Sequence, residues 1–230
     1  MSMSSTTSAL RAKRCARFRA IDLYPVTSEP LSAGRSTLEV LDGLLAGGAT
    51  CVQLREKEKS ARELFELAQA AREKTRQAGA LLILNDHLDM ALAVEADGVH
   101  LGQDDLPLEA ARRLAPDLLL GRSTHSLEQA LEAQAEGADY INIGPLFPTE
   151  TKATHQQFLG AQAVEAVAAR LSIPFSCMGG IKQEHLAELV GRGAMRIALV
   201  TAVTQAPDVA AATAALRRTI QEAAVDAGRA

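Results

Sequence analysis

The sequence has little cysteine, few aromatic residues and no tryptophan. Its three cysteines, Cys15, Cys51 and Cys177, lie far apart and form no CxxC pair, which excludes a zinc ribbon and a dithiol redox motif. Reduced thiols of a cytoplasmic protein are therefore expected. The five histidines show neither HxxxH nor HExxH spacing, so no zinc enzyme is indicated. A GxGxxG motif and a Ser-His-Asp elbow are also absent.

Long apolar runs and an excess of one charge are lacking as well. The longest apolar stretches, near Leu118 and Ile197, are strand-sized and far shorter than the roughly 20 residues that cross a bilayer. The net charge of −4, with mixed signs, creates no basic field for nucleic acid. We therefore expect neither a membrane nor a nucleic acid as partner. The sequence is compatible with a homo-oligomer but leaves the oligomeric state open.

The chain does contain a repeated alternation of strand-like and helix-like segments. Its 230 residues, 47% of them hydrophobic, suffice for one domain with a large core. Eight strands are predicted to begin at Ile21, Thr50, Leu81, Gly98, Leu118, Tyr140, Pro174 and Arg196. Helices are predicted over 36–46, 60–78, 88–95, 107–114, 126–136, 161–171, 182–190 and 207–224. This pattern favours the α/β class, with a single (β/α)8 TIM barrel over residues 21–230, above an open doubly wound sheet.

The first 20 residues differ in composition from the rest. They are rich in Ser and Thr and carry five basic residues but no acidic one. An organellar transit peptide has a similar composition, but the segment lacks an apolar stripe and a secretory apolar region. We therefore predict a disordered basic arm over residues 1–20.

Polar residues follow nearly every predicted strand, at the end of the barrel where catalysis is expected. Since the carboxyl ends of all strands meet at one face, these side chains should surround one site. The set is Gln53, Arg55, Lys57, Asn85, Asp86, Gln103, Asp104, Asp105, Ser123, Thr124, His125, Thr149, Thr151, Lys152, Gly179, Gly180 and Thr201.

Asp86 and Asp105 follow neighbouring strands, so their carboxylates could share one hard cation such as Mg2+. The alternative is that each caps the helix that follows it. Their occurrence near Arg55 and Lys57 favours the cation site.

The segment 52–57 alternates polar side chains, placing Gln53, Arg55 and Lys57 on one face. Such a face is typical of a diphosphate clamp, whereas the alternative is a solvated strand end whose neighbours Glu56, Glu58 and Lys59 are surface charges.

Gly179 and Gly180 lie between a strand and a helix, where barrels commonly bind phosphate, together with the turn at Val200 and Thr201. His100, on the fourth strand, fits either the site or the barrel interior.

In this order, VQLREK, LILNDHLDMALAVEADGVHLGQDDLP, GRSTHSLEQALEAQAEGADYINIGPLFPTETK and GGI resemble thiamine phosphate synthase over residues 20 to 205. The resemblance implies a transferase of thiamine biosynthesis. It couples hydroxymethylpyrimidine diphosphate with thiazole phosphate, giving thiamine phosphate and pyrophosphate by a dissociative, Mg2+-dependent substitution.

The resemblance also assigns roles to residues. Asp86 and Asp105 are implied metal ligands. The implied catalytic residues are Arg55, Lys57, Ser123 and Lys152. The implied substrate contacts are Arg55, Lys57, Asn85 and Lys152 at the diphosphate, Gln53, His100 and Ser123 at the pyrimidine, Thr149 near the thiazole, and Gly180, Val200 and Thr201 at its phosphate. Thr151 and Gly179 are also predicted to bind substrate.

Four residues depart from the family pattern, namely Arg122, Met178, Met195 and Arg196, and they bear on packing behind the fifth and eighth strands. Two other functions are compatible with such a barrel. A thiazole tautomerase shares the barrel but not the full diphosphate and metal set, and a non-catalytic barrel that binds thiazole or thiamine phosphate would need no groups that stabilise a departing diphosphate. The intact charged set favours the synthase.

Overall fold

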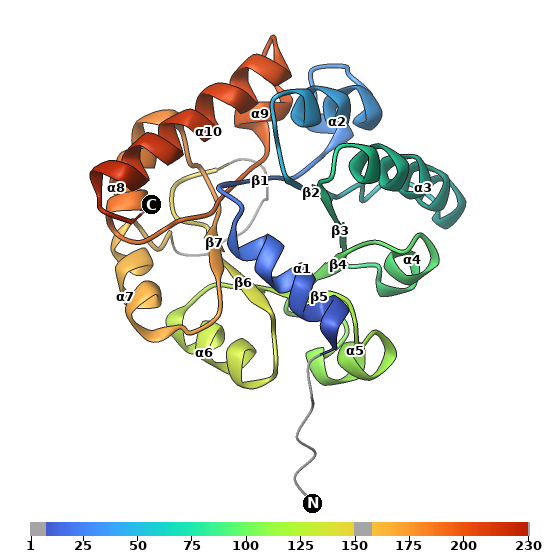
Figure 1. Ribbon diagram of the computed structural model, residues 1–230, viewed down its shortest axis with the longest axis horizontal. Helices are drawn as coiled ribbons and strands as arrows, with labels where there is room; N and C mark the ends of the chain where they lie inside the picture. Colours follow the sequence, from blue (N-terminus) through green and yellow to red (C-terminus); the bar gives the residue numbers. More distant parts are fainter. Residues whose placement is uncertain (1–7, 150–157, 230) are drawn as a thin grey trace, which may run out of the picture.

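The computed structural model describes residues 8–149 and 158–229, which form a ring of parallel strands surrounded by helices (Figure 1). Seven neighbouring pairs are hydrogen-bonded in the order β1-β8-β7-β6-β5-β4-β3-β2. The strands are β1 (Leu23–Pro25), β2 (Cys51–Leu54), β3 (Leu81–Asn85), β4 (Gly98–Leu101), β5 (Leu119–Thr124), β6 (Tyr140–Ile143), β7 (Phe175–Cys177) and β8 (Ile197–Leu199).

The ring closes between β1 and β2 through a single parallel bridge, Val26 to Gln53. The amide of Thr27 donates to the carbonyl of Gln53 at 2.9 Å, just beyond that bridge. Elsewhere, strands such as β2 and β3 pair over four residues. The (β/α)8 barrel predicted from the sequence is confirmed, and its β1–β2 seam has fewer backbone contacts than the β2–β3 pair.

The predicted helices are present with small shifts at their ends. Ser36 and Ser60 each start a helix with a capping box, in which the serine and a glutamate three residues later satisfy each other's backbone amides. The segment 182–190 splits into a 3-10 turn and a short helix. The helices are α2 (Thr37–Ala46), α3 (Ala61–Gln77), α4 (Leu88–Ala93), α5 (Leu108–Leu114), α6 (Leu127–Ala135), α7 (Gln162–Arg170), η2 (Gln183–His185), α8 (Leu186–Gly191) and α10 (Val209–Asp226).

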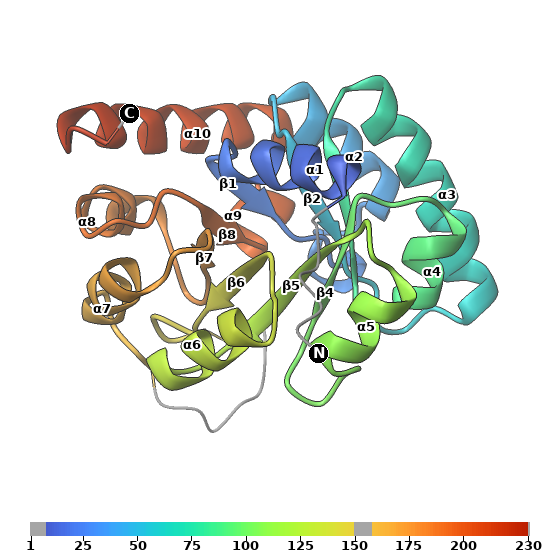
Figure 2. The same ribbon diagram turned by 60° about the horizontal axis from the view of Figure 1, so that its bottom comes forward.

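Three further helical segments were not predicted: α1 (Ala9–Arg19), the 3-10 turn η1 (Glu29–Leu31) and α9 (Thr201–Thr204). The long helix α10 closes the outer ring, packing beside α2 and α8 (Figure 2). None of the helices in the described part of the chain is long and apolar enough to span a membrane.

Two apolar cores follow from the alternation of side chains along the strands. Residues that point outward, such as Val52 and Leu84, join the helices in a large core. Residues that point inward fill the barrel in a smaller one that includes Tyr24 and Tyr140. The helix residue Phe18 belongs to this inner core, so α1 contributes to the barrel floor.

Residues 9–19 therefore differ from the predicted disordered arm, because they form α1 across the amino-terminal opening of the barrel (Figure 1). The prediction is wrong there because α1 is held mainly by charge rather than by an apolar stripe. Arg11 pairs with Asp139 at 2.8 Å, and Arg14 lies 3.4 Å from Asp97. Both aspartates are buried.

The residues that depart from the family pattern have definite contacts. Arg196 donates hydrogen bonds to the carbonyls of Phe18 and Arg19, at the carboxyl end of α1. Burial, with a smaller contribution from Arg19, lowers the pKa of Arg196 to about 10. Arg122 is buried and donates to the carbonyl of Gln103 at 3.1 Å. Arg196 thus anchors α1, and Arg122 holds the loop after β4.

Candidate active site

A cavity of about 140 Å3, open to solvent, lies at the carboxyl ends of the strands. Most residues predicted for the site line this cavity. They are Gln53, Arg55, Asn85, His100, Ser123, Thr149, Gly179, Gly180, Val200 and Thr201, and they come from seven of the strands or the loops that follow them. Thr151 and Lys152 lie outside the described residues.

A charged group lies around Arg55 at the carboxyl ends of β2 to β4. Burial lowers the pKa of Arg55, and the nearby carboxylates of Asp86 and Glu56 oppose that shift. Burial also raises the pKa of Asp86, helped by a hydrogen bond to Asp105 and by its charge, whereas Lys57 acts in the opposite direction. These effects require Asp86 to lie close to both Asp105 and the two cations. The structure therefore brings together the four charged side chains predicted for this region.

Neither aspartate caps the helix that follows it. Helix α4 begins after His87 without a side-chain cap, and α5 begins after Pro107, also without one. Asp105 instead accepts a hydrogen bond from the amide of Gly102 at 2.6 Å. Asp86 has a φ of +63°, a left-handed conformation that Asp tolerates better than most residues and that clusters at functional sites. The alternative that Asp86 and Asp105 each cap the following helix is therefore wrong.

Asp86, whose pKa is raised by burial and by the neighbouring Asp105, forms with that residue a suitable pair of ligands for a divalent cation, because a cation would relieve the repulsion between two carboxylates. Across residues 8–149 and 158–229 there is no group of three His, Cys, Asp or Glu side chains able to hold a metal. Asp86 and Asp105 thus fit a Mg2+ that takes its remaining oxygens from water and from a phosphorylated ligand, and they do not fit a cage made by the protein alone.

A hydrogen-bonded chain crosses the floor of the cavity and connects Gln53 to Ser123. The carboxamide nitrogen of Gln53 donates to the hydroxyl of Tyr24 at 2.8 Å, and the hydroxyls of Tyr24 and Tyr140 are 2.9 Å apart. His100 Nδ1 lies 3.1 Å from the Tyr140 hydroxyl, and its Nε2 lies 2.9 Å from Ser123 Oγ. His100 therefore has the partners of a site residue, and its side chain also fills the barrel interior.

Sequence reasoning missed both tyrosines, because a tyrosine inside an apolar strand is typical of any barrel core. Tyr24 and Tyr140 are fully buried, and the Phe18 ring lies 4.0 Å from the Tyr140 ring, centroid to centroid. Gly121 makes room for them, since a Cβ there would lie 2.3 Å from the Tyr140 hydroxyl and 2.6 Å from His100 Nδ1. The sequence does contain one indication of this close packing, because Gly121 is a glycine inside a predicted strand.

Neither tyrosine should ionise while the protein stays folded. Burial raises the pKa of both well above the usual value of 10.0. Because the unfolded chain releases these protons near pH 10, the tyrosines' contribution to stability is present below that pH and is lost as the pH rises above it. Tyr24 and Tyr140 are the only tyrosines and there is no tryptophan, so the tyrosinate absorbance band reports on them alone.

We expect the tyrosinate band to be absent at about pH 11 and to appear together with the loss of far-ultraviolet circular dichroism. A tyrosinate band in protein that retains its circular dichroism would contradict the buried chain.

The opposite wall of the cavity contains the predicted phosphate site. Gly179 and Gly180 have φ values of +101° and +62°. A Cβ at Gly180 would lie 2.3 Å from the carbonyl oxygen of Pro148, and one at Gly179 would lie 2.5 Å from Pro145. The amides of Gly179, Gly180 and Thr201 donate to no other residue within the described ranges. The glycines thus permit close packing of two loops and leave amides for an anion.

Asn142 is a third residue that the sequence analysis missed. It lies on β6, lines the cavity, and is buried. Its amide nitrogen contacts Met178 Sδ at 3.7 Å, while its Oδ1 is buried and finds no partner among the residues that the structure describes. A buried acceptor without a partner is expected to bind a ligand group or water.

The sequence is similar to that of known proteins. The family profile described as thiamine monophosphate synthase matches residues 23–203. The thiamine-phosphate synthase of Moorella thermoacetica is 47% identical over 203 residues, covering 88% of this chain and 97% of that protein. The one from Chloroflexus aurantiacus is 48% identical over 195 residues, covering 85% and 90%.

Solved structures give the same result. The thiamine phosphate pyrophosphorylase from Pyrococcus furiosus has a TM-score of 0.82 and 38% identity, covering 88% of this chain and 96% of that one. A 3-hexulose-6-phosphate synthase, with a TM-score of 0.66 and 19% identity, shares the fold; the alignment covers 87% of this chain and 100% of that one.

Proposed function

Because this chain belongs to the thiamine monophosphate synthase family, we propose that its barrel cavity performs the synthase reaction with the groups described above. The protein is a transferase that couples hydroxymethylpyrimidine diphosphate with thiazole phosphate and releases pyrophosphate. The observation that carries the assignment of the site is the charged group of Arg55, Lys57, Asp86 and Asp105, because cations and a metal ion would stabilise the negative charge that develops on a departing diphosphate.

The diphosphate lies in this proposal against Arg55, Lys57 and Asn85. Asp86 and Asp105 would hold a Mg2+, which would supply further positive charge to the phosphate oxygens. As the bond between the pyrimidine methylene and the diphosphate breaks, negative charge grows on the leaving oxygen, and Arg55 and Lys57 stabilise it there. Lys152, which lies outside the described residues, is proposed to add a third cation. No side chain need act as a nucleophile or a strong base.

The pyrimidine lies over the hydrogen-bonded chain on the cavity floor. Gln53 and Ser123 form the two ends of that chain, so their polar atoms are held at a fixed separation through Tyr24 and Tyr140. Fixed polar groups orient the ring so that its methylene faces the second substrate. Asn142 Oδ1, which has no partner among the described residues, is a suitable acceptor for an amino group on the ring.

The thiazole phosphate lies against the opposite wall. Its phosphate accepts hydrogen bonds from the amides of Gly179, Gly180 and Thr201, and Val200 continues this turn. Thr149 and Thr151, in the loop after β6, are proposed to lie toward the thiazole ring. Placing the phosphate here directs the ring nitrogen toward the pyrimidine, so that capture of the pyrimidine cation forms the new carbon–nitrogen bond. Substituting Gly180 would displace the neighbouring loop and therefore does not test this phosphate site cleanly.

An assay of pyrophosphate release tests the reaction. Purified protein is expected to release pyrophosphate and form thiamine phosphate in equal amounts only when both substrates and Mg2+ are present. Release from the pyrimidine diphosphate alone would indicate a hydrolase. No release under any condition, together with binding of thiazole phosphate, would favour the tautomerase or the non-catalytic binding protein. Chelation by EDTA, followed by added Mg2+, is the control for the metal requirement.

A further inference from the structure

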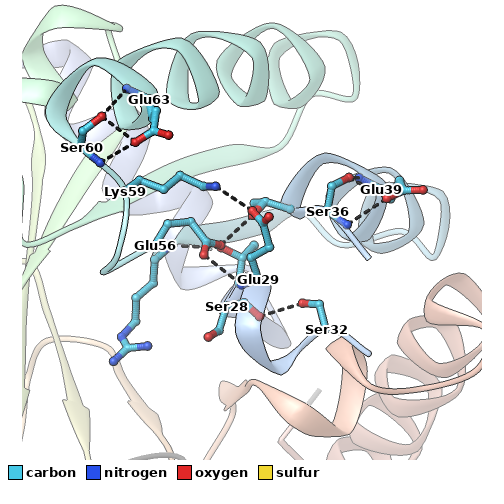
Figure 3. A network of polar contacts seen from close by, with 12 residues as sticks. Ser28, Glu29, Ser32, Ser36, Glu39, Glu56, Lys59, Ser60 and Glu63 are labelled. Carbon is cyan, nitrogen blue, oxygen red and sulfur yellow. Dashed lines mark hydrogen bonds and ion pairs between the residues drawn. The ribbon is translucent and has the colours of Figure 1, made fainter. Parts of the chain in front are cut away.

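Glu56 is a buried carboxylate that the proposed reaction does not use. It follows Arg55 in a run of charged residues, yet only 6% of its surface is exposed. Its oxygens accept three hydrogen bonds, from Thr27 Oγ1 at 2.8 Å, from Thr37 Oγ1 at 2.9 Å and from the amide of Glu29 at 2.9 Å (Figure 3). The alternative that Glu56 is a surface charge is therefore wrong.

These contacts connect three segments at the seam where the barrel closes. Thr27 follows β1, Thr37 begins α2, and Glu56 lies just after β2. Glu29 lies next to Glu56 in this network and pairs with Lys59 at 2.8 Å (Figure 3). Because β1 and β2 share a single backbone bridge, the Glu56 contacts continue the connection between them toward the cavity.

The chemistry of the groups determines which atom donates and which accepts in each hydrogen bond of the network. A carboxylate only accepts hydrogen bonds, so the Thr27 hydroxyl must direct its one hydrogen at Glu56. The lone pairs of the Thr27 hydroxyl oxygen are then available to the amide of Arg55, which donates to Thr27 Oγ1 at 3.0 Å. Glu56 thus orients a hydroxyl that in turn holds the backbone of Arg55.

We propose that Glu56 is a positioning residue, which acts through Thr27 to hold Arg55 where its guanidinium meets the diphosphate. This inference rests on the proposed function, since it assumes that Arg55 binds the diphosphate. Glu56 itself contacts no substrate. Its removal should weaken the diphosphate site and leave the thiazole phosphate site on the opposite wall unchanged.

Glutamine at position 56 cannot reproduce the network. If the glutamine oxygen accepts hydrogen bonds from both threonines, the glutamine NH2 faces the amide of Glu29. Two donors then face each other and no hydrogen bond can form between them. If the group is flipped, the NH2 faces the hydroxyl of Thr27, which must then accept from two donors and turn its own hydrogen away from Glu56. Glu56→Gln is therefore a test that conserves size while breaking the arrangement.

The test measures binding of inorganic pyrophosphate, in the presence of Mg2+, by calorimetry on the purified full chain. We expect Glu56→Gln to raise the Kd about tenfold. Thr27→Val should raise the Kd by a similar factor, whereas Thr27→Ser, which keeps the hydroxyl, should bind pyrophosphate as tightly as wild type. Because both residues act through the same contact, the double variant Glu56→Gln/Thr27→Val should have a Kd no higher than that of either single variant. In steady-state kinetics, kcat/KM for the pyrimidine diphosphate should fall, as for Arg55 variants, and KM for thiazole phosphate should stay within twofold of wild type.

Two matched variants separate positioning from general loop stability. Thr37→Val removes another hydroxyl bound to Glu56 but not the one that holds Arg55, and Glu58→Gln changes an exposed neighbouring glutamate. Both should bind pyrophosphate within twofold of wild type. An increase in Kd with Thr37→Val as large as that with Thr27→Val would overturn the proposal. Should Glu56→Gln fail to fold, the comparison of Thr27→Val with Thr27→Ser still decides it.

Arg55→Ala distinguishes failure of this inference from failure of the proposed function. If Arg55→Ala weakens pyrophosphate binding and Glu56→Gln and Thr27→Val do not, the positioning role is wrong while the assignment of the diphosphate site stands. If Arg55→Ala leaves the affinity unchanged, the proposed diphosphate contact of Arg55 is wrong, and the role of Glu56 fails with it.

Discussion

Arg55→Ala is expected to lower kcat/KM for the pyrimidine diphosphate on the order of 100-fold or more, about 3 kcal/mol. Arg55 is half-buried in the cavity wall, and burial lowers the pKa of its guanidinium, so its charge is poorly screened by water. A cation in such surroundings stabilises charge on a leaving group more strongly than one in solvent does. The effect should fall mainly on kcat, because negative charge on the diphosphate is greatest as the bond breaks.

Arg62→Ala is the matched control, since Arg62 is an exposed arginine on α3 and should leave kcat/KM unchanged. Arg55→Lys should recover part of the loss, because lysine keeps the charge but not the planar pair of donors. An Arg55→Ala protein whose kcat/KM stays within threefold of wild type would show that the diphosphate binds elsewhere.

Asp86→Asn and Asp105→Asn should each reduce turnover at limiting Mg2+ by about 100-fold or more. Asparagine suits both positions. It tolerates the left-handed backbone found at residue 86, where φ is +63°, and its oxygen can still accept the hydrogen bond from Gly102 at residue 105. The substitutions therefore remove a negative charge with little change in shape, and both proteins should fold.

The measurement is a Mg2+ titration of pyrophosphate release, together with calorimetric binding of Mg2+ in the presence of pyrophosphate. The concentration of Mg2+ that gives half-maximal activity should rise in both variants. Asp104→Asn, a change at an exposed neighbour, is the control and should behave as wild type. Wild-type turnover at limiting Mg2+ in both variants would exclude Asp86 and Asp105 as the metal ligands.

The sequence alone was enough to predict the barrel, because its signals are local. A strand such as β3 is a short apolar run, and a helix such as α3 starts with Ser60 and Glu63, which form a capping box in any context. Once eight such units are recognised, the carboxyl ends of the strands must share one face, which is why Gln53, Arg55 and Ser123 could be assigned to a common cavity. The resemblance to a family added the proposed chemistry.

Other features depend on contacts between residues far apart in the chain, which no local pattern reveals. Helix α1 has no apolar stripe, and its place is determined by Arg11 and Arg14 meeting the buried carboxylates of Asp139 and Asp97 more than 80 residues away. Tyr140 resembles a core residue until its hydroxyl is found beside that of Tyr24, 116 positions earlier.

Glu56 is a single side chain for which the sequence and the tertiary structure lead to different expectations. In the sequence it is one acid in a charged run, where a solvated surface position is the ordinary expectation. The closing of the barrel between β1 and β2 surrounds it with two threonine hydroxyls and an amide, and those partners make its burial tolerable. Residue type and spacing thus determined which elements form and where their polar ends meet. Only the tertiary structure decided which polar groups lose water and find partners, because burial is a property of the assembled barrel.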